Sequence, residues 1–216
     1  MKTPTNWNQI TIGQFQHINA AIKNYPDNAV SQSVWMLAAL TGKSREELLA
    51  MDFTREFKPL MAELNWVNTT PLPEQLPAEF EVDGQKYRLV YDIKQRTTGQ
   101  FIDLAHFAAE PESIITNLHY ILAVLCVPGG QKDHSVDFEQ RAKIFRDKMT
   151  IDIAYPIATF FLKQWLDSLP RILTYLEKRA MKKRSLWKRI TGLLSVMAGW
   201  LRWIKWPKTA PGGTTT

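Results

Sequence analysis

The chain has 216 residues, of which 45% are hydrophobic and 22% are charged, and both values are near the globular average. This composition excludes a wholly disordered chain, a collagen and a low-complexity sequence. The single cysteine, Cys126, excludes an internal disulfide framework and a Cys-rich metal site. The formal net charge of +6 is unevenly divided, because the chain from Arg171 onward carries 11 Lys/Arg and one acidic residue. The body is therefore mildly acidic and the C-terminal segment strongly basic.

The first part of the chain is predicted to be helical. Apolar residues recur at three- and four-residue spacing within residues 5–25, where Thr11 is the predicted N-cap. A second helix is predicted over residues 29–40. Ser44 and Glu47 have the spacing of a capping box, in which each side chain satisfies a free backbone amide of the other. They predict a further short helix.

A longer helix is predicted over residues 53–68, followed by a proline-rich linker over residues 68–78. Apolar and polar residues then alternate on both sides of the pair Asp83-Gly84, over about residues 79–93. Because both central residues of a type I′ turn need positive φ, an Asp-Gly pair in this setting predicts a β-hairpin. Two strands are marginally stable alone, so we expect the hairpin to pack on the helices or to pair with a partner's edge.

Helical patterning resumes after the hairpin. Apolar density is highest after residue 150, which predicts a central buried helix, and Pro170 is expected to begin a separate last helix. The sequence thus predicts a mainly α-helical body over residues 1–181 with one inserted β-hairpin. The other helices of this half are predicted over about residues 98–108, 111–125 and 138–148.

Two segments of the chain resemble each other. Residues 11–15 and residues 97–101 share the pattern Thr-x-Gly-Gln-Phe. Because Thr is a favoured N-cap and Gly permits close approach of another segment, the pattern is best explained as two equivalent helix starts. The alternative is a binding role for the Gln side chains. The candidate interaction motif comprises Gln14, Phe15, Gln100 and Phe101.

Few residues form a catalytic or metal-binding pattern. The four histidines form neither His-x-x-x-His nor His-Glu-x-x-His, so no zinc site is expected. Asp103 and His106 lie three residues apart on a predicted helix and could pair, in an arrangement that is usually structural. Cys126 lies in an apolar run and is expected to be a buried thiol rather than a nucleophile. We therefore expect a non-enzymatic protein with no cofactor and no metal.

The C-terminal segment is the most distinctive part of the sequence. Basic clusters flank twelve consecutive uncharged residues, Ile190–Leu201, and four of the eight tryptophans lie in the last 30 residues. Apolar residues recur at helical spacing, which predicts a basic amphipathic helix over residues 182–208, followed by a disordered tail over residues 209–216. The residues expected to bind a partner or a membrane are Lys182, Lys183, Arg184, Trp187, Lys188, Arg189, Trp200, Arg202, Trp203, Lys205 and Trp206.

Several motifs occur together in the remainder of the chain. They are Trp7, Ile-Thr-Ile-Gly-Gln-Phe at residues 10–15, Leu-Thr-Gly-Lys-Ser at residues 40–44, the Asp83-Gly84 hairpin, Thr-Thr-Gly-Gln-Phe-Ile-Asp-Leu at residues 97–104 and Leu-Ala-x-Leu-x-x-Pro at residues 122–128. This combination resembles small proteins encoded among the virion genes of tailed bacteriophages, some of which are tail-assembly chaperones. The resemblance implies a non-enzymatic morphogenesis protein that binds other phage structural proteins. It carries over no catalytic residues, and the basic C-terminal segment lies outside it.

Two alternative functions stay open. A peripheral membrane protein could use residues 185–206, and a nucleic-acid-binding factor could use the same basic residues, although the uncharged run argues against the latter. Tail or connector proteins of the phage are the expected partners. A second copy of the chain and an anionic membrane surface are further candidates, whereas nucleic acid is not favoured. The N-terminus lacks the apolar core of a signal peptide, so we expect the protein in the host cytoplasm or incorporated into the virion.

Overall fold

The computed structural model describes residues 3–89, 96–128 and 134–179, and within them the chain is mainly helical with one two-stranded antiparallel sheet. This confirms the fold class that the sequence predicts. The predicted amphipathic helix over residues 182–208 and the tail over residues 209–216 lie outside the described residues. In chain order the elements are η1 (Trp7–Gln9), α1 (Ile12–Asn24), α2 (Ala29–Thr41), α3 (Arg45–Leu49), η2 (Phe53–Phe57), α4 (Lys58–Glu63), α5 (Trp66–Thr69), β1 (Glu79–Val82), β2 (Gln85–Arg88), α6 (Thr98–Phe107), α7 (Pro111–Thr116), α8 (Leu118–Leu125), α9 (Phe138–Lys148) and α10 (Ile151–Arg179).

Capping boxes set the start of three of the described helices. Thr11, Ser44 and Thr97 are the N-caps of α1, α3 and α6, and each forms a capping box with the Gln or Glu three residues later. The cap oxygen satisfies a free amide of the first turn, which is why the helices begin at these positions. At the end of α2, Gly42 adopts φ 72°, the left-handed conformation that closes a helix at little steric cost to glycine.

The prediction of a single helix over residues 53–68 is wrong. Asp52 begins this region by accepting hydrogen bonds from the backbone amides of Thr54 and Arg55. The Phe57 amide then bonds the Asp52 carbonyl, which produces the wide π-type turn of η2. Two short helices, α4 and α5, follow in place of one long one.

Two other predicted boundaries are also wrong. The predicted helix over residues 111–125 is divided at Asn117, whose Nδ2 donates to the Phe107 carbonyl at 3.0 Å. A tertiary hydrogen bond therefore holds this residue at the junction of α7 and α8. Conversely, α10 continues through Pro170, where a separate helix was expected. Proline removes one backbone hydrogen bond, and the other hydrogen bonds of a 29-residue helix are enough for the helix to continue past it.

The hairpin has the predicted turn. Asp83 and Gly84 both have positive φ, 52° and 77°, as a type I′ turn requires. The strands pair in regular register, and β2 ends at Arg88. This is short of the predicted limit at residue 93, and residues 90–93 lie outside the described part of the chain.

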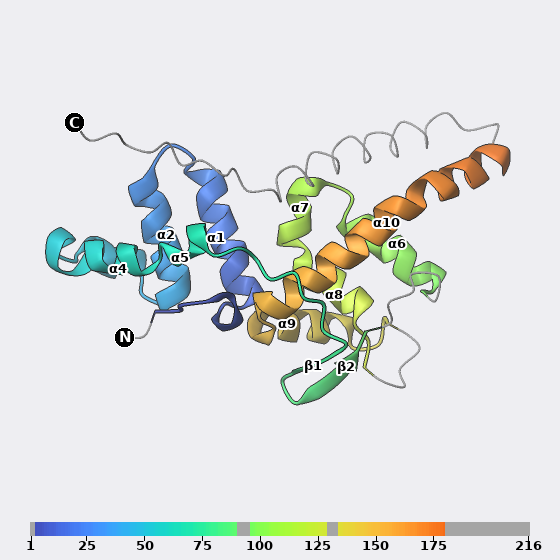
Figure 1. The fold of residues 1–216 in the computed structure, drawn as a ribbon, viewed down its shortest axis with the longest axis horizontal. Coiled ribbons are helices and arrows are strands. Elements are labelled where there is room, and N and C mark those ends of the chain that lie inside the picture. The colour runs from blue at the N-terminus through green and yellow to red at the C-terminus, as the bar shows by residue number, and fades with distance from the viewer. Residues whose placement is uncertain (1–2, 90–95, 129–133, 180–216) are drawn as a thin grey trace.

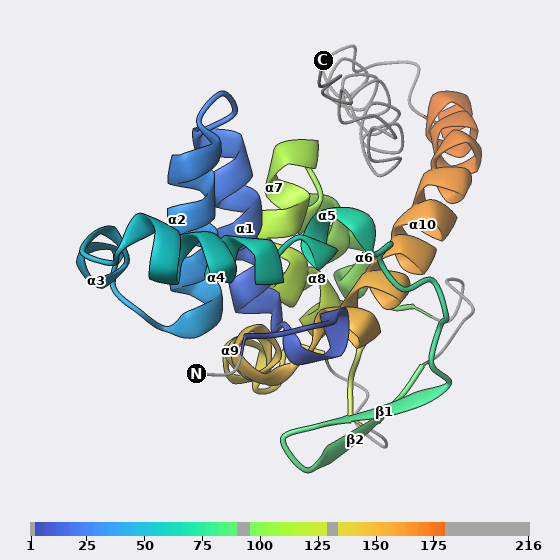
Figure 2. The ribbon, with the colours of Figure 1, turned by 60° about the vertical axis from the view of Figure 1, so that its left-hand side comes forward.

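The hairpin packs on the helices, which is one of the two outcomes that the sequence predicts. The Phe80 and Tyr87 rings stack with centroids 5.3 Å apart, and the Tyr87 ring meets the edge of Phe145 in α9 at 5.1 Å. Tyr87 also forms an antiparallel bridge with Pro128, which follows α8. Figure 2 shows the hairpin projecting beneath the helices. Its apolar face is thus covered, and its turn extends outward.

Helix α9 connects the two halves of the molecule. Figure 1 shows α1, α2 and α4 on one side, α6, α8 and α10 on the other, and α9 between them at the base. Two backbone hydrogen bonds join the start of the chain to the α9–α10 junction, from Ile12 N to Met149 O at 3.0 Å and from Ile151 N to Ile10 O at 2.9 Å. All four residues are buried, so this junction lies within the core.

Candidate functional site

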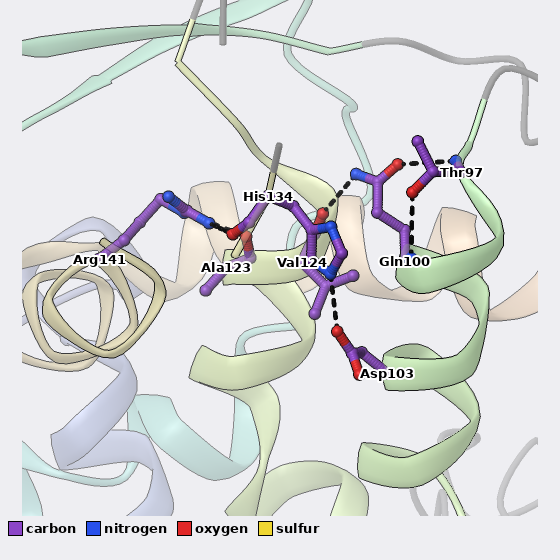
Figure 3. A network of polar contacts seen from close by, with 7 residues as sticks. All are labelled: Thr97, Gln100, Asp103, Ala123, Val124, His134 and Arg141. Atoms are coloured by element: carbon purple, nitrogen blue, oxygen red, sulfur yellow. Dashed lines mark hydrogen bonds and ion pairs between the residues drawn. The ribbon is translucent and has the colours of Figure 1, made fainter. Parts of the chain in front are cut away.

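A cluster of polar side chains lies at the C-terminal end of α8 (Figure 3). There the chain leaves the helix in an extended conformation, with Cys126 at φ −110° and ψ 96°, and Pro128 then pairs with the hairpin. An extended exit leaves the last helical carbonyls without backbone partners. Three side chains donate to them instead: Arg141 Nε to Ala123 O at 3.1 Å, Gln100 Nε2 to Val124 O at 2.9 Å and Arg96 Nη1 to Leu125 O at 2.7 Å.

These three donors, Arg96, Gln100 and Arg141, form what we call the α8 clamp. Two of them are cations at the end of a helix where the backbone dipole is negative, which is a favourable arrangement. Arg141 is 4% exposed, and its guanidinium also donates to the carbonyls of His134 and Val136. Burial lowers the pKa of both arginines from the ordinary value. Neither arginine was predicted from the sequence, because each is distant in sequence from the carbonyl that it serves.

A hydrogen-bonded Asp–His pair lies next to the clamp. His134 Nε2 is 2.6 Å from Asp103 Oδ2, and His134 is buried. Gly99 permits this approach, because a Cβ there would lie 3.2 Å from His134 Cε1. The predicted pairing of Asp103 with His106 is therefore wrong, since the tertiary structure gives Asp103 a partner 31 residues away. The His106 ring instead packs against Phe107, with centroids 5.1 Å apart.

The arrangement around His134 favours a structural role over nucleophilic catalysis. An Asp–His pair activates a nucleophile only when a hydroxyl or thiol reaches the imidazole. The nearby Thr97 Oγ1 is the N-cap of α6 and accepts from the Gln100 amide at 3.2 Å. Cys126 is buried, as predicted, and burial raises the pKa of its thiol to about 12, so it stays protonated. The pair is thus suited to holding the loop before α9 against the start of α6.

The described residues contain two hollows of very different size. None of their His, Cys, Asp and Glu side chains gather in groups of three that could hold a metal ion. A cavity of about 10 Å³ between α6, α8 and α10, lined by side chains such as Leu104 and Phe161, has room for about one water. An open depression of about 450 Å³ lies beside the start of α1. Its lining includes both Arg146 and Asp147, so these side chains do not select a ligand of one charge.

The repeated motif performs the same task twice. Oε1 of Gln14 and of Gln100 accepts from the backbone amide of the preceding cap threonine, at 3.0 Å in each copy. The amide nitrogens donate across to the end of a neighbouring helix, Gln14 to Ala39 O at 3.3 Å and Gln100 to Val124 O at 2.9 Å. Each Gln thus caps its own helix and ties it to another.

The aromatic residues of the motif pack within the molecule. The Phe15 ring meets the edge of Trp7 with centroids 6.1 Å apart, and Phe101 lies 6.2 Å from Trp165. Both phenylalanines are half-buried. These contacts give the motif a structural explanation, and a binding role for Gln14, Phe15, Gln100 and Phe101 stays a prediction.

Large apolar side chains are exposed mainly in one stretch of the described sequence. Among the described residues six such side chains reach solvent, and four of them lie between α2 and η2. Their exposed fractions range from 40% to 58%. Helix α2, which carries two of them, packs on α3 and on α4, and α4 packs on η2. We call these four residues the α2–η2 surface: Val30, Trp35, Leu49 and Phe53.

The C-terminal residues expected to bind a partner or a membrane, from Lys182 to Trp206, lie outside the described residues. Within the described ranges, every helix is too short or too polar to cross a bilayer. The arrangement of the basic and aromatic side chains in this segment therefore stays a prediction from the sequence.

Comparison with known proteins adds no relative. No protein-family model matches the chain, and no curated protein or solved structure matches it. The function is therefore inferred from the residues and their geometry.

Proposed function

We propose that this protein binds other structural proteins during the assembly of a tailed-bacteriophage particle, as a tail-assembly chaperone or as a minor virion component. The observation that carries the proposal is the α2–η2 surface, where Leu49 and Phe53 are more than half exposed. Covering apolar area releases about 25 cal/mol per Å². The elements that carry these side chains are linked by packing through α2 and α4, and exposed apolar side chains that lie close together favour a protein partner.

The α8 clamp supports binding rather than catalysis. Its described hydrogen bonds reach carbonyls of this chain. The adjacent Asp103–His134 pair lies beside Thr97, which is the N-cap of α6, and Cys126 is a buried, protonated thiol. These groups hold elements together and leave surface side chains as the means of recognition. The resemblance of the sequence motifs to those of phage morphogenesis proteins supports the same proposal, and it suggests tail or connector proteins as partners.

Co-expression with the tail and connector proteins of the same phage tests the proposal. We expect the full chain to co-purify with at least one of them as a complex of defined mass, measured by size-exclusion chromatography with light scattering. Leu49→Ser and Phe53→Ser should each weaken that complex, because they remove exposed apolar area. Ile102→Ser, at a position 60% exposed but outside the α2–η2 surface, is the matched control.

Circular dichroism spectra and melting temperatures of the three variants establish that each one folds. A full chain that forms no complex with any tail or connector protein would contradict the assembly role. A complex that survives both Leu49→Ser and Phe53→Ser at parental affinity would instead remove the α2–η2 surface from the proposal.

A further inference from the structure

The outer edge of β1 has backbone groups that no other described segment pairs with. The two residues that flank the Asp83-Gly84 turn, Val82 and Gln85, are opposite each other, and such a closing pair exchanges hydrogen bonds. Pairs that exchange hydrogen bonds then alternate along the two strands with pairs that do not. The Ala78–Leu89 pair should be hydrogen-bonded by this rule, and Leu89 N does donate to Ala78 O at 3.2 Å. The N–H and C=O groups of Glu79 and Glu81 therefore point away from β2.

The two edges of the hairpin differ. On the β2 side, Tyr87 forms a bridge with Pro128, so the end of α8 already lies along that edge. On the β1 side, no backbone hydrogen bond from another described segment reaches Glu79 or Glu81, and both residues are exposed. Figure 1 shows the hairpin at the periphery of the molecule. An added strand thus has one edge open to it, that of β1.

The side chains of the hairpin specify what kind of strand fits this edge. One face is apolar, since Phe80 and Val82 are buried, and the other carries Glu79 and Glu81. Within the hairpin these glutamates already stand opposite cations, Glu79 opposite Arg88 and Glu81 opposite Lys86. Opposite charges across neighbouring strands are stabilising and like charges are destabilising. A complementary strand therefore alternates apolar residues with Lys or Arg.

A second copy of the chain fits poorly at this edge. Pairing of two β1 strands in antiparallel register places glutamates of one copy beside those of the other, which is unfavourable. Protected edges usually carry Lys, Pro or a bulge, and β1, Glu-Phe-Glu-Val in unbroken register, has none of these. Its glutamates thus select the partner by charge while the backbone stays available.

We propose that the open edge of β1 is a docking site for an extended segment of another protein in which basic and apolar residues alternate, bound by β-strand addition. This inference extends the proposed function by naming the chemistry of one partner segment. It involves a surface distinct from the α2–η2 surface, and its test needs no phage protein. Failure of one proposal is therefore distinguishable from failure of the other.

Nuclear magnetic resonance of the full ¹⁵N-labelled chain tests the edge directly. The probe is a capped peptide with the sequence of residues 84–89, Gly-Gln-Lys-Tyr-Arg-Leu, which has the required pattern in β2. We expect saturable shifts of the Glu79 and Glu81 amide signals and slower hydrogen exchange at both. A control peptide with Glu in place of Lys and Arg should bind at least tenfold more weakly at low salt.

Variants of the protein separate charge selection from backbone pairing. The double substitution Glu79→Gln with Glu81→Gln should abolish the tenfold preference between the two peptides. Asp27→Asn with Glu46→Gln changes the net charge equally at exposed positions on other elements, and it should leave the preference intact. The proposal is overturned if the basic peptide leaves the Glu79 and Glu81 signals unchanged at millimolar concentration, or if both peptides shift them equally.

Discussion

At the scale of single residues, the end of α8 is stabilised by side chains that are distant in the sequence. Among them, Arg141 uses one buried guanidinium to donate to the carbonyls of Ala123, His134 and Val136. A buried carbonyl left without a donor costs about 1–3 kcal/mol. Arg141 is therefore expected to contribute more to stability than an exposed basic residue of the same helix α9, such as Lys143.

Replacement of Arg141 by methionine tests this expectation. Arg141→Met keeps much of the aliphatic volume and removes every N–H donor of the side chain. We expect the free energy of unfolding to fall by about 3 kcal/mol, measured by urea denaturation. Lys143→Met, on the exposed face of α9, is the matched control and should change it by less than about 0.5 kcal/mol. Equal effects of the two substitutions would refute a special role for Arg141.

His119 is expected to make stability dependent on pH. Gln16 Nε2 lies 3.0 Å from His119 Nδ1, and burial together with the charge of Arg146 lowers the pKa of His119 to about 4. The unfolded chain binds the proton near the ordinary pKa of about 6.5, so stability falls as pH falls from about 6.5 to 4. This difference corresponds to roughly 3 kcal/mol.

The substitution His119→Gln removes this titration. We expect the variant to lose less unfolding free energy than the parent protein between about pH 7 and pH 4.5. Urea denaturation at a series of pH values measures both slopes, and the carboxyl groups common to both proteins cancel in the comparison. Parallel slopes would show that His119 does not carry the dependence.

At the scale of elements, the hairpin depends on its turn and on the surfaces that cover it. Two strands alone are marginally stable. Here Tyr87 packs on Phe145 of α9 and pairs with Pro128, so both the face and the β2 edge have support from the body. The turn itself projects outward, and its contribution is therefore a matter of backbone conformation alone.

Gly84→Ala isolates that contribution. Gly84 has φ 77°, and a Cβ there would meet no atom within 4 Å, so the cost arises only from the left-handed backbone. We expect a loss of about 1 kcal/mol in the free energy of unfolding. Gly84→Asn should cost less, because asparagine tolerates this conformation better. An alanine variant as stable as the parent would mean that the turn changes its conformation in solution.

At the scale of the whole molecule, the body and the C-terminal segment have opposite charge. From Arg171 onward the chain carries 11 basic residues and one acidic residue, whereas the body is mildly acidic. The segment also holds half of the tryptophans, a composition suited to a partner or to an anionic membrane surface. These two roles differ in what they predict for the mass of the protein in solution.

Light scattering of the full chain and of a chain shortened to end at Lys182 distinguishes them. If the segment drives assembly, we expect a defined oligomer that becomes a monomer on shortening. If the segment binds membranes, the shortened chain should have a single defined mass, whereas the full chain should aggregate unless anionic lipid or detergent is added. An identical, well-defined mass for both chains would assign the segment neither role.

Helix starts and the hairpin turn were predictable because local chemistry decides them. Thr11, Ser44 and Thr97 cap helices with a partner three residues away, and Asp83-Gly84 supplies positive φ within the turn itself. The helix break at Asn117 was not predictable, because it depends on a hydrogen bond to Phe107. Local patterns predict an element when the interaction that ends it is also local.

The sequence by itself determined the helical class, the place of the hairpin, the helix caps and the separation of charge between body and C-terminal segment, since each depends on neighbours along the chain. Only the tertiary structure decided the pairing of Asp103 with His134, the α8 clamp and the open edge of β1. These depend on which segments, distant in sequence, pack side by side. The packing of the described chain brings three carbonyls to Arg141, and it places no other described segment along the outer edge of β1.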